Sequence, residues 1–170
     1  MPRPRSESAR AAVLGAVTAL VAEDGYGRLS MEAIARRAGV SKQTVYRWWP
    51  TKAAVVLEAL NEGAQVIAPA DGDAREFLRR TVRGAHRNRA LLAGLMAEAQ
   101  LDDAFARSFR DDFLARRRAV LRELLEPDPE AEQLAELVFA RLWYRLLARS
   151  GPLDRRFADE LWETVRRRTH

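Results

Sequence analysis

The sequence predicts an all-α fold, and three observations lead to this prediction. Its 170 residues contain no stretch in which apolar and polar residues alternate as they do in a half-buried strand. Alanine, leucine, arginine and glutamate, all good helix formers, dominate the chain. Glycine and proline fall mainly between the periodic segments. Because 48% of the residues are apolar, these helices can bury a hydrophobic core.

The first predicted helices are delimited by caps and glycines. A helix over residues 8–23 carries a stripe of valine and leucine and stops at Gly25, a candidate left-handed C-cap. Ser30 is placed to cap a short helix over residues 31–38, which Gly39 ends. Each boundary is therefore predicted from residues that lie next to it.

A second short helix and a longer one complete the N-terminal segment. Ser41 can cap the short helix, and Pro50 ends it at Trp49. Thr51 can cap the next helix, which runs to residue 60. The stretch 61–73 contains two glycines and a proline, so we place the domain boundary there.

Beyond this boundary the periodicity predicts five helices, arranged as an antiparallel bundle, which makes about nine helices in all. They cover residues 74–88, 89–100, 102–125, 129–150 and 153–168. The third is the clearest, because Phe105, Phe109 and Phe113 recur at helical spacing along one face.

The net charge is confined to the first third of the chain. Residues 1–52 carry nine basic and four acidic side chains, which accounts for the whole net charge of +5. The remaining residues hold equal numbers of basic and acidic side chains. A basic segment beside a neutral body indicates that the first third binds a polyanion. For the rest of the chain, we interpret the arginines as ordinary solvated helix faces.

The two short helices have the size and pattern of a helix pair that reads DNA. Gly39 suits the tight turn between them, and Val45 and Trp49, four residues apart, would face inward. The outer face of the second helix is then polar, short-armed and cationic, as the major groove requires. The alternative is an amphipathic helix pair within a bundle, with its charges solvated.

A specific set of residues recurs along this stretch. It consists of Gly25, Leu29-Ser30-Met31, Ile34-Ala35, Ala38-Gly39-Val40-Ser41, Thr44-Val45-Tyr46, Trp49 and Lys52. In this pattern the chain resembles the N-terminal helix-turn-helix of the TetR family of bacterial transcriptional regulators. The resemblance covers residues 8–60 closely and residues 61–170 diffusely. It implies a DNA-binding domain at residues 1–60 and a ligand-binding and dimerisation domain at residues 61–170.

The resemblance also implies which side chains meet double-stranded DNA. Those expected to contact bases are Lys42, Gln43, Thr44 and Arg47. Those expected to contact phosphates are Ser30, Met31, Tyr46, Trp48 and Lys52. Two residues depart from the family pattern, since Trp49 replaces the usual phenylalanine and Gln43 stands where glycine is frequent. The operator therefore cannot be copied from a relative.

For the C-terminal domain the resemblance implies a homodimer interface in the last two helices and a pocket for a small apolar or amphipathic effector. Candidate interface residues are Leu137, Phe139, Leu142, Trp143, Leu146, Phe157, Leu161, Trp162 and Val165. Candidate pocket residues are Phe77, His86, Leu95, Met96, Gln100, Phe105, Phe109, Phe113 and Trp143. The alternative for every one of them is a place in the intrachain core, which we expect for about half of the interface set and for most of the pocket set.

Other classes of protein are disfavoured by what the sequence lacks. It has no cysteine and only two histidines, and it contains no phosphate-binding loop, G-x-S-x-G or H-E-x-x-H motif. We therefore expect no enzyme activity, cofactor or metal site. No apolar run approaches the ~20 residues of a membrane span, and the N-terminus has no secretory signal pattern. We expect a soluble cytoplasmic protein.

The resemblance to the TetR family implies a dimeric transcriptional repressor that a small-molecule effector releases from a palindromic operator. The helix at residues 51–60 would couple the two domains. Two alternatives stay open: a DNA-binding repressor without a small-molecule effector, and a dimeric helical interaction module with a vestigial helix-turn-helix.

Overall fold

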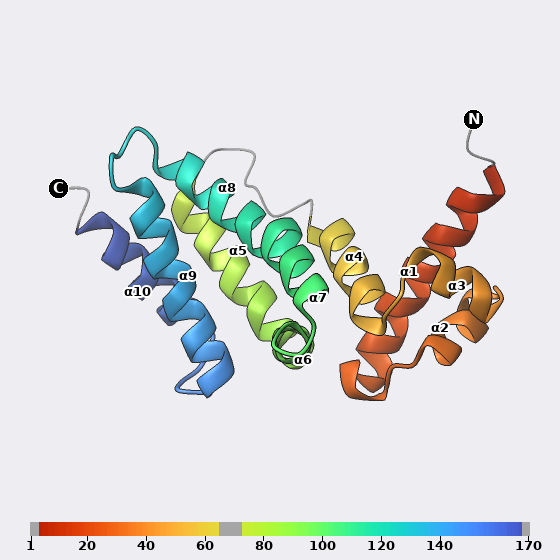
Figure 1. Cartoon of the computed structure of the whole chain (residues 1–170). Helices are drawn as coiled ribbons and strands as arrows, with labels where there is room; N and C mark the ends of the chain where they lie inside the picture. The colour runs from red at the N-terminus through yellow and green to blue at the C-terminus, as the bar shows by residue number, and fades with distance from the viewer. Residues whose placement is uncertain (1–3, 65–72, 168–170) are drawn as a thin grey trace. The chain divides into compact units, whose positions relative to one another are not determined.

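The computed structural model describes residues 4–64 and 73–167, and every regular element within these ranges is helical. The predicted all-α fold is confirmed (Figure 1). In chain order the elements are α1 (Pro4–Asp24), the 3₁₀ turn η1 (Tyr26–Arg28), α2 (Met31–Ala38), α3 (Lys42–Trp48), α4 (Lys52–Ala64), α5 (Ala74–Arg87), α6 (Arg89–Ala99), α7 (Asp103–Ser108), the π-helical turn η2 (Phe109–Leu114), α8 (Ala115–Leu125), α9 (Ala131–Ala148) and α10 (Arg155–Arg166). No helix of the described ranges combines the length and the apolar character needed to cross a membrane.

The described residues form two compact units. Unit 1 comprises residues 4–64 and 94–109, and unit 2 comprises residues 73–93 and 110–167. Helix α6 therefore contributes its C-terminal part, from Gly94 onward, to unit 1. The sequence assigns residues 94–109 to the C-terminal domain, yet in the structure they pack with the N-terminal helices. Part of the predicted boundary segment, residues 65–72, lies outside the described residues.

The caps predicted in unit 1 are present. The Ser30 hydroxyl accepts a hydrogen bond from the Ala33 backbone N–H at 3.2 Å, and the Ser41 hydroxyl accepts one from Thr44 N–H at 3.1 Å. Gly39 has the left-handed conformation expected at a helix C-terminus (φ 66°, ψ 30°). The prediction for Gly25 was wrong in part. Its φ is positive, at 78°, but its ψ of 165° leads the chain directly into η1 instead of forming a left-handed cap.

Two helices of unit 1 are longer than predicted. Helix α1 begins at Pro4, because proline is favoured in the first turn of a helix, where its missing N–H costs nothing. Helix α4 continues to Ala64, and an ion pair of 2.9 Å between Arg10 and Glu62 joins its last turn to α1. The core of this unit lies where α1 packs against α2 and α4, and it includes the buried side chains Val13, Val17, Ile34, Val45 and Val55.

The predicted helix over residues 102–125 is interrupted by the π-helical turn η2. This interruption is why the described residues contain ten α-helices where about nine were predicted. Phe105, Phe109 and Phe113 recur every four residues, a spacing that drifts around an α-helix of 3.6 residues per turn. A wider turn compensates for that drift, and all three side chains are buried.

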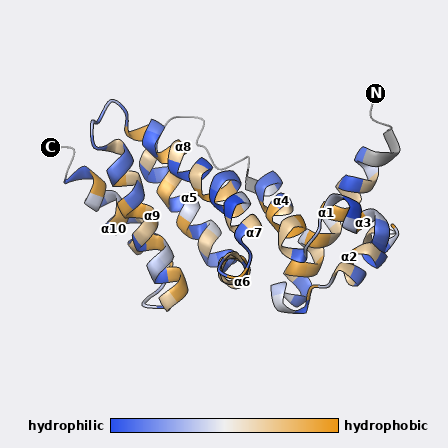
Figure 2. Cartoon of the chain, in the orientation of Figure 1, coloured by the Kyte–Doolittle hydropathy of each residue, from blue (hydrophilic) through white to orange (hydrophobic). Residues whose placement is uncertain are grey.

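Unit 2 is an antiparallel bundle in which α10 packs on α5 and α9, and α8 packs on α9 and α5 (Figure 1). Phe77, Leu78, Leu121 and Phe157 fill its centre with no exposed surface. Hydrophobic and hydrophilic residues occur together along each of these helices, as amphipathic packing requires (Figure 2).

Candidate nucleic-acid interface

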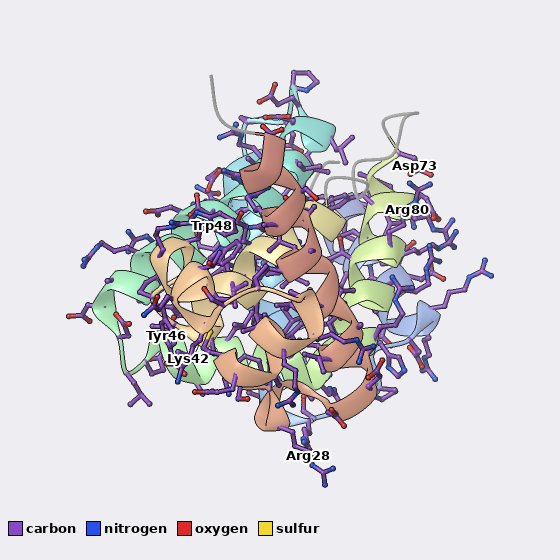
Figure 3. The ribbon with its side chains drawn as sticks, turned by 90° about the vertical axis from the view of Figure 1, so that its right-hand side faces the viewer. Arg28, Lys42, Tyr46, Trp48, Asp73 and Arg80 are labelled. Carbon is purple, nitrogen blue, oxygen red and sulfur yellow. The ribbon has the colours of Figure 1, made fainter. Side chains whose placement is uncertain are left out.

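Helix α3 has one buried face and one exposed face. Val45 has no exposed surface and Trp49, which directly follows α3, is 3% exposed, so both face inward as predicted. Lys42, Gln43 and Arg47 are exposed, and so is Tyr46. Lys42 and Tyr46 lie side by side at the edge of the unit (Figure 3), where the ammonium nitrogen is 5.6 Å from the centre of the phenol ring.

The four residues predicted to contact bases differ in how free their side chains are. Gln43 and Arg47 are exposed, and the Arg47 guanidinium lies 5.6 Å from the Trp48 ring. Lys42 instead forms an ion pair with Glu32 of α2. Thr44 is half-buried, and its hydroxyl is 2.8 Å from the Ser41 hydroxyl, so it takes part in the cap of its own helix. In this structure, only Gln43 and Arg47 of the four are unengaged by another polar side chain of the described residues.

The ion pair between Lys42 and Glu32 shifts both groups. The hydrogen bond from Lys42 lowers the pKa of the Glu32 carboxyl, and the same bond raises the pKa of the Lys42 ammonium. Both side chains are about half exposed, so the pair can exchange with a competing anion at little cost.

The side chains predicted to contact phosphates also differ in their exposure and in what they touch. Tyr46 is 44% exposed and Trp48 is half-buried, with its ring edge-on to Trp49. The ammonium of Lys52 lies 4.4 Å from the centre of the Tyr26 ring and 3.4 Å from the Tyr26 carbonyl oxygen. It is half-buried, so it reaches solvent from a fixed position beside η1.

Two candidates at the start of α2 can act only in a restricted way. The Ser30 hydroxyl is already the cap of α2. Met31 is 5% exposed, so its side chain belongs to the core and cannot meet a phosphate. A contact there would use the backbone N–H groups of the first turn, where the helix dipole favours an anion.

Several cations of unit 1 have no carboxylate partner among the described residues. They are Arg28, Arg36, Arg47, Lys52 and Arg107, whereas Arg37 forms a bidentate pair with Glu23 at 2.6 and 3.0 Å. Arg28 points away from the unit into solvent (Figure 3). Unpaired cations on a small helical unit are suited to a polyanion, because each can neutralise a phosphate without first breaking an ion pair.

A close contact joins η1 to α6 within unit 1. The Tyr26 ring lies against the backbone of Gly94, so near that a Cβ at Gly94 would be 2.3 Å from the ring atom Cδ1. The Tyr26 hydroxyl is buried and has no hydrogen-bond partner among the residues that the structure describes. Burial, with the nearby charge of Glu98, raises the pKa of Tyr26 to about 12. The sequence does not reveal this contact, since the two residues are far apart in the chain and the only signal of it is the small size of glycine.

Two models of known protein families match this chain and show the family to which it belongs. Residues 13–59 match the model of the bacterial regulatory proteins of the tetR family, and residues 69–165 match the tetracyclin repressor-like C-terminal domain. The chain belongs to the TetR family. It is a DNA-binding transcriptional regulator with an N-terminal helix-turn-helix and a C-terminal helical domain.

Individual TetR-family proteins agree with this assignment over most of the chain. The DNA-binding transcriptional repressor TetR of Mycobacteroides abscessus is 30% identical over 179 residues, which cover 95% of this chain and 93% of that protein. The crystal structure of the TetR family regulator SCO0332 superposes with a TM-score of 0.74 at 31% identity, covering 90% of this chain and 93% of that one. The structure of Thermus thermophilus FadR in complex with lauroyl-CoA shares the fold (TM-score 0.66, 21% identity, 92% of each chain).

The structure divides the candidate effector-pocket residues between the two units. Unit 1 holds Leu95, Met96, Gln100, Phe105 and Phe109, and unit 2 holds Phe77, His86, Phe113 and Trp143. The rings of Phe105 and Phe109 stack with their centres 5.9 Å apart. His86 and Gln100 are exposed on the surface.

The candidate dimer residues fall into two groups. Five of them, Leu142, Leu146, Phe157, Leu161 and Val165, are buried in the protomer's own core and offer no surface to a second chain. The others, Leu137, Phe139, Trp143 and Trp162, are exposed or half-buried. The structure adds Tyr144 and Leu147, which are 67% and 44% exposed and share a face of α9 with Leu137 at spacings of seven and ten residues. The same helical period could have found them in the sequence.

Proposed function

We propose that this TetR-family regulator is a homodimeric repressor that reads a palindromic operator with α3 and is released from it by a small apolar or amphipathic effector. The observation that carries the proposal is the division of α3 into a buried face and an exposed face on which Gln43 and Arg47 have no polar side-chain partner among the described residues. Gln43 is able to bond adenine edges and Arg47 guanine edges in the major groove. A repressor of the bacterial chromosome would act in the cytoplasm.

The two sets of contacts would have different roles on DNA. Lys42, Gln43, Thr44 and Arg47 would read bases, with Lys42 first released from Glu32. Tyr46, Trp48, Lys52 and the first turn of α2 would hold phosphates and set the register. Two copies of α3 would then lie in successive major grooves, about one helical turn apart.

An apolar stripe on α9 supports the dimer. Leu137, Tyr144 and Leu147 form an exposed face on a helix that is otherwise packed into the bundle. Large apolar side chains gathered on one helix face usually mark an interface. The half-buried Trp143 and Trp162 on α9 and α10 would extend this interface.

The release mechanism would be a shift between two populations of the dimer. An effector that binds only the form with wrongly spaced α3 helices would weaken DNA binding by its differential affinity. Within unit 1, α6 carries the pocket candidates Leu95 and Met96 directly beside Gly94, which contacts Tyr26 of η1. This contact gives α6 a route to the DNA-binding helices in addition to α4.

The test of the DNA-binding proposal begins with a selection from a randomised 30-bp duplex library by the wild-type protein. The selected duplex and a scrambled duplex are then titrated by fluorescence anisotropy with wild type, Arg47→Ala and Arg156→Ala. Arg156 is an exposed arginine of unit 2 and serves as the control. We expect Arg47→Ala to lose about tenfold or more on the selected duplex and to relax preference at one position of each half-site. If wild type selects no sequence, the alternative of an interaction module with a vestigial helix-turn-helix is favoured.

Two further measurements test the dimer and the effector. Leu137→Arg and Tyr144→Arg should each convert the dimer to a monomer in analytical ultracentrifugation, and an unchanged mass would place the interface elsewhere. Lauroyl-CoA, the ligand of the FadR relative, is the first probe for release of the selected duplex. If neither it nor a panel of amphipathic acids and amines releases the DNA, the repressor without a small-molecule effector is the better model.

A further inference from the structure

The carboxylate of Glu58 joins three helices of unit 1. Glu58 lies on α4, and its Oε2 accepts a hydrogen bond of 2.5 Å from the indole Nε1–H of Trp49, at the end of α3. Its Oε1 pairs with the guanidinium of Arg10 on α1. Arg10 also pairs with Glu62, one turn further along α4. Each oxygen of Glu58 thus holds a different helix.

The buried indole makes this contact necessary. Trp49 is only 3% exposed, and a buried indole N–H needs an acceptor, because leaving it unpaired forfeits its hydrogen bond to water. A phenylalanine, which the family resemblance leads one to expect at this position, would need no acceptor. In this chain Trp49 therefore places a hydrogen-bond donor in the core, and the Glu58 carboxylate accepts its hydrogen bond.

The same tryptophan fixes the end of α3 and contacts its outer side. The backbone N–H of Trp49 donates to the Val45 carbonyl at 2.9 Å and closes the last turn of the helix. Its ring meets the Trp48 ring edge-on, with the centres 5.5 Å apart. Trp48 in turn lies beneath the Arg47 guanidinium. A continuous set of contacts therefore runs from Glu58 to a side chain that we assign to base recognition.

We propose that Glu58 is a positioning residue for sequence recognition, which holds α3 at the angle its base contacts require by bonding Trp49 on one side and Arg10 on the other. The inference rests on the proposed role of α3 in reading bases. Glu58 is not itself one of the side chains that we propose to contact DNA. Its removal should therefore reduce discrimination between sequences and leave general attraction to phosphates intact.

The experiment compares four variants on the selected and scrambled duplexes. Trp49→Phe removes the N–H and keeps the aromatic ring. Glu58→Ala removes the acceptor, and Glu58→Gln removes the charge but retains an oxygen that can accept the bond. Glu62→Ala is the matched control, because it takes the other ion pair from Arg10 without touching Trp49. Thermal melting of each variant confirms that it is folded at the temperature of the titration.

We expect Trp49→Phe and Glu58→Ala each to bind the selected duplex about tenfold more weakly, with less than a twofold change on the scrambled duplex. A fifth variant, the double variant Trp49→Phe/Glu58→Ala, should lose no more than Glu58→Ala alone, since both substitutions remove the same bond between Trp49 and Glu58. Glu58→Gln should recover most of the loss, and Glu62→Ala should match wild type on both duplexes.

Other results overturn the inference. An equal change of affinity on both duplexes would mean that Glu58 acts only through its charge or through stability. A loss of affinity in Glu62→Ala as large as in Glu58→Ala would mean that only the ion pairs with Arg10 matter. If wild type selects a sequence and Glu58→Ala binds it as tightly, the inference fails and the proposed function stands. If wild type selects no sequence, both fail.

The indole N–H signals in a ¹H–¹⁵N spectrum provide a readout independent of DNA. The chain has four tryptophans, and Trp49→Phe identifies the signal of Trp49 by its loss. That signal should shift in Glu58→Ala and stay in place in Glu62→Ala. An unmoved signal in Glu58→Ala would show that the bond does not form in solution.

Discussion

The α2–α3 pair of unit 1 and the bundle of unit 2 place their helices by different interactions. Helices α2 and α3 have only eight and seven residues, too few to be stable alone, and each begins with a serine whose hydroxyl caps its first turn. The helices of unit 2 are held by large apolar side chains contributed by distant parts of the chain, such as Phe77 and Phe157. Side chains also cap α5 and α10 of unit 2, and α2 and α3 also bury Ile34 and Val45, so the contrast is one of degree: the short helices depend more on their caps and the longer helices more on packing.

Helices α5 and α3 differ in the partners of their arginines. On α5, Arg75 and Arg79 both pair with Asp159, and two further arginines pair with Glu76. On α3, Arg47 has no carboxylate partner among the described residues. In a chain so rich in arginine, the presence of a cation says little about function. Arg87 on α5 and Arg155 on α10 are also exposed without a carboxylate partner among the described residues, so it is the place of Arg47 on the exposed face of α3, and not the missing partner alone, that points to DNA.

The largest effect is expected from opening the core of the bundle. Phe157 has no exposed surface, and the Arg145 guanidinium lies 3.9 Å from the centre of its ring. Phe157→Ala should lower the free energy of unfolding by about 3–5 kcal/mol, through lost burial and the cavity left behind. Urea denaturation followed by circular dichroism measures the loss. Leu101→Ala, at a site 86% exposed, should change it by less than about 0.5 kcal/mol. Similar losses in the two variants would contradict packing as the source of order in unit 2.

A smaller loss should follow from adding one methyl group where α6 meets η1. In Gly94→Ala the new Cβ would lie 2.3 Å from Cδ1 and 2.7 Å from Cε1 of Tyr26, so the ring or the helix must move. We expect a cost of about 1–3 kcal/mol, measured by the same denaturation. Gly84→Ala on α5 is the matched control, because a Cβ there meets nothing within 4 Å. That control should gain up to about 1 kcal/mol from better helix propensity. Equal effects at the two glycines would show that Tyr26 is free to yield.

What the sequence could predict follows the same division. The bounds of α2 and the caps Ser30 and Ser41 were predicted correctly, because each depends on residues within about three positions. The buried face of α3 was also predicted, since Val45 and Trp49 are one helical turn apart. These features need no knowledge of where the rest of the chain lies.

The features that the sequence could not predict depend on residues brought together by folding. Nothing in the pattern pairs Trp49 with Glu58 across the turn between α3 and α4, or Tyr26 with Gly94. On α9 and α10 the periodicity found the apolar residues but could not tell an inward face from an outward one. Leu142 and Leu146 were therefore predicted to be dimer contacts together with Leu137, although they lie in the core.

The Ser41 cap of α3 should contribute about 1 kcal/mol to the free energy of unfolding. Ser41→Ala removes the side-chain acceptor of the Thr44 N–H, which keeps only its bond of 3.0 Å to the Ser41 carbonyl, and it removes the partner of the Thr44 hydroxyl. We expect the free energy of unfolding to fall by about 1 kcal/mol. Ser108→Ala is the control, since the Ser108 hydroxyl bonds a carbonyl of its own helix and caps nothing. It should be neutral within about 0.5 kcal/mol. A loss at Ser108 equal to that at Ser41 would argue against local capping as the basis of α3.

Tyr26→Phe should have little effect at pH 7, because the buried hydroxyl that it removes has no partner. The difference should appear in alkali. The pKa of Tyr26 is raised to about 12 in the folded protein, above its ordinary value of 10.0. Above pH 10 the unfolded chain ionises this phenol while the folded protein keeps it neutral. The Tyr26 phenol therefore contributes fully to the free energy of unfolding of wild type below pH 10, and this contribution is lost as the pH rises from 10 toward 12. Denaturation midpoints of wild type and Tyr26→Phe should coincide at pH 8 and separate above pH 10, with the variant the more stable. Parallel curves would mean that the phenol titrates normally.

The smallest effect concerns the ion pair between Lys42 and Glu32, beside the proposed DNA contacts of unit 1. Glu32→Gln should leave stability nearly unchanged, because the pair with Lys42 is exposed and such pairs are weak. It frees the ammonium and removes a negative charge near the proposed phosphate contacts. Binding to the scrambled duplex should therefore strengthen a few-fold, and the dependence of log K on log salt should steepen by about one.

Glu163→Gln provides the control for that experiment. Glu163 lies on α10, and the hydrogen bond from Arg166 lowers its pKa as the bond from Lys42 lowers that of Glu32. Removing this charge from unit 2 should change neither the affinity nor the salt slope. An equal gain from both variants would trace the effect to net charge. A gain confined to Glu32→Gln would show that the position of the charge decides it, and that Glu32 restrains Lys42 until DNA displaces it.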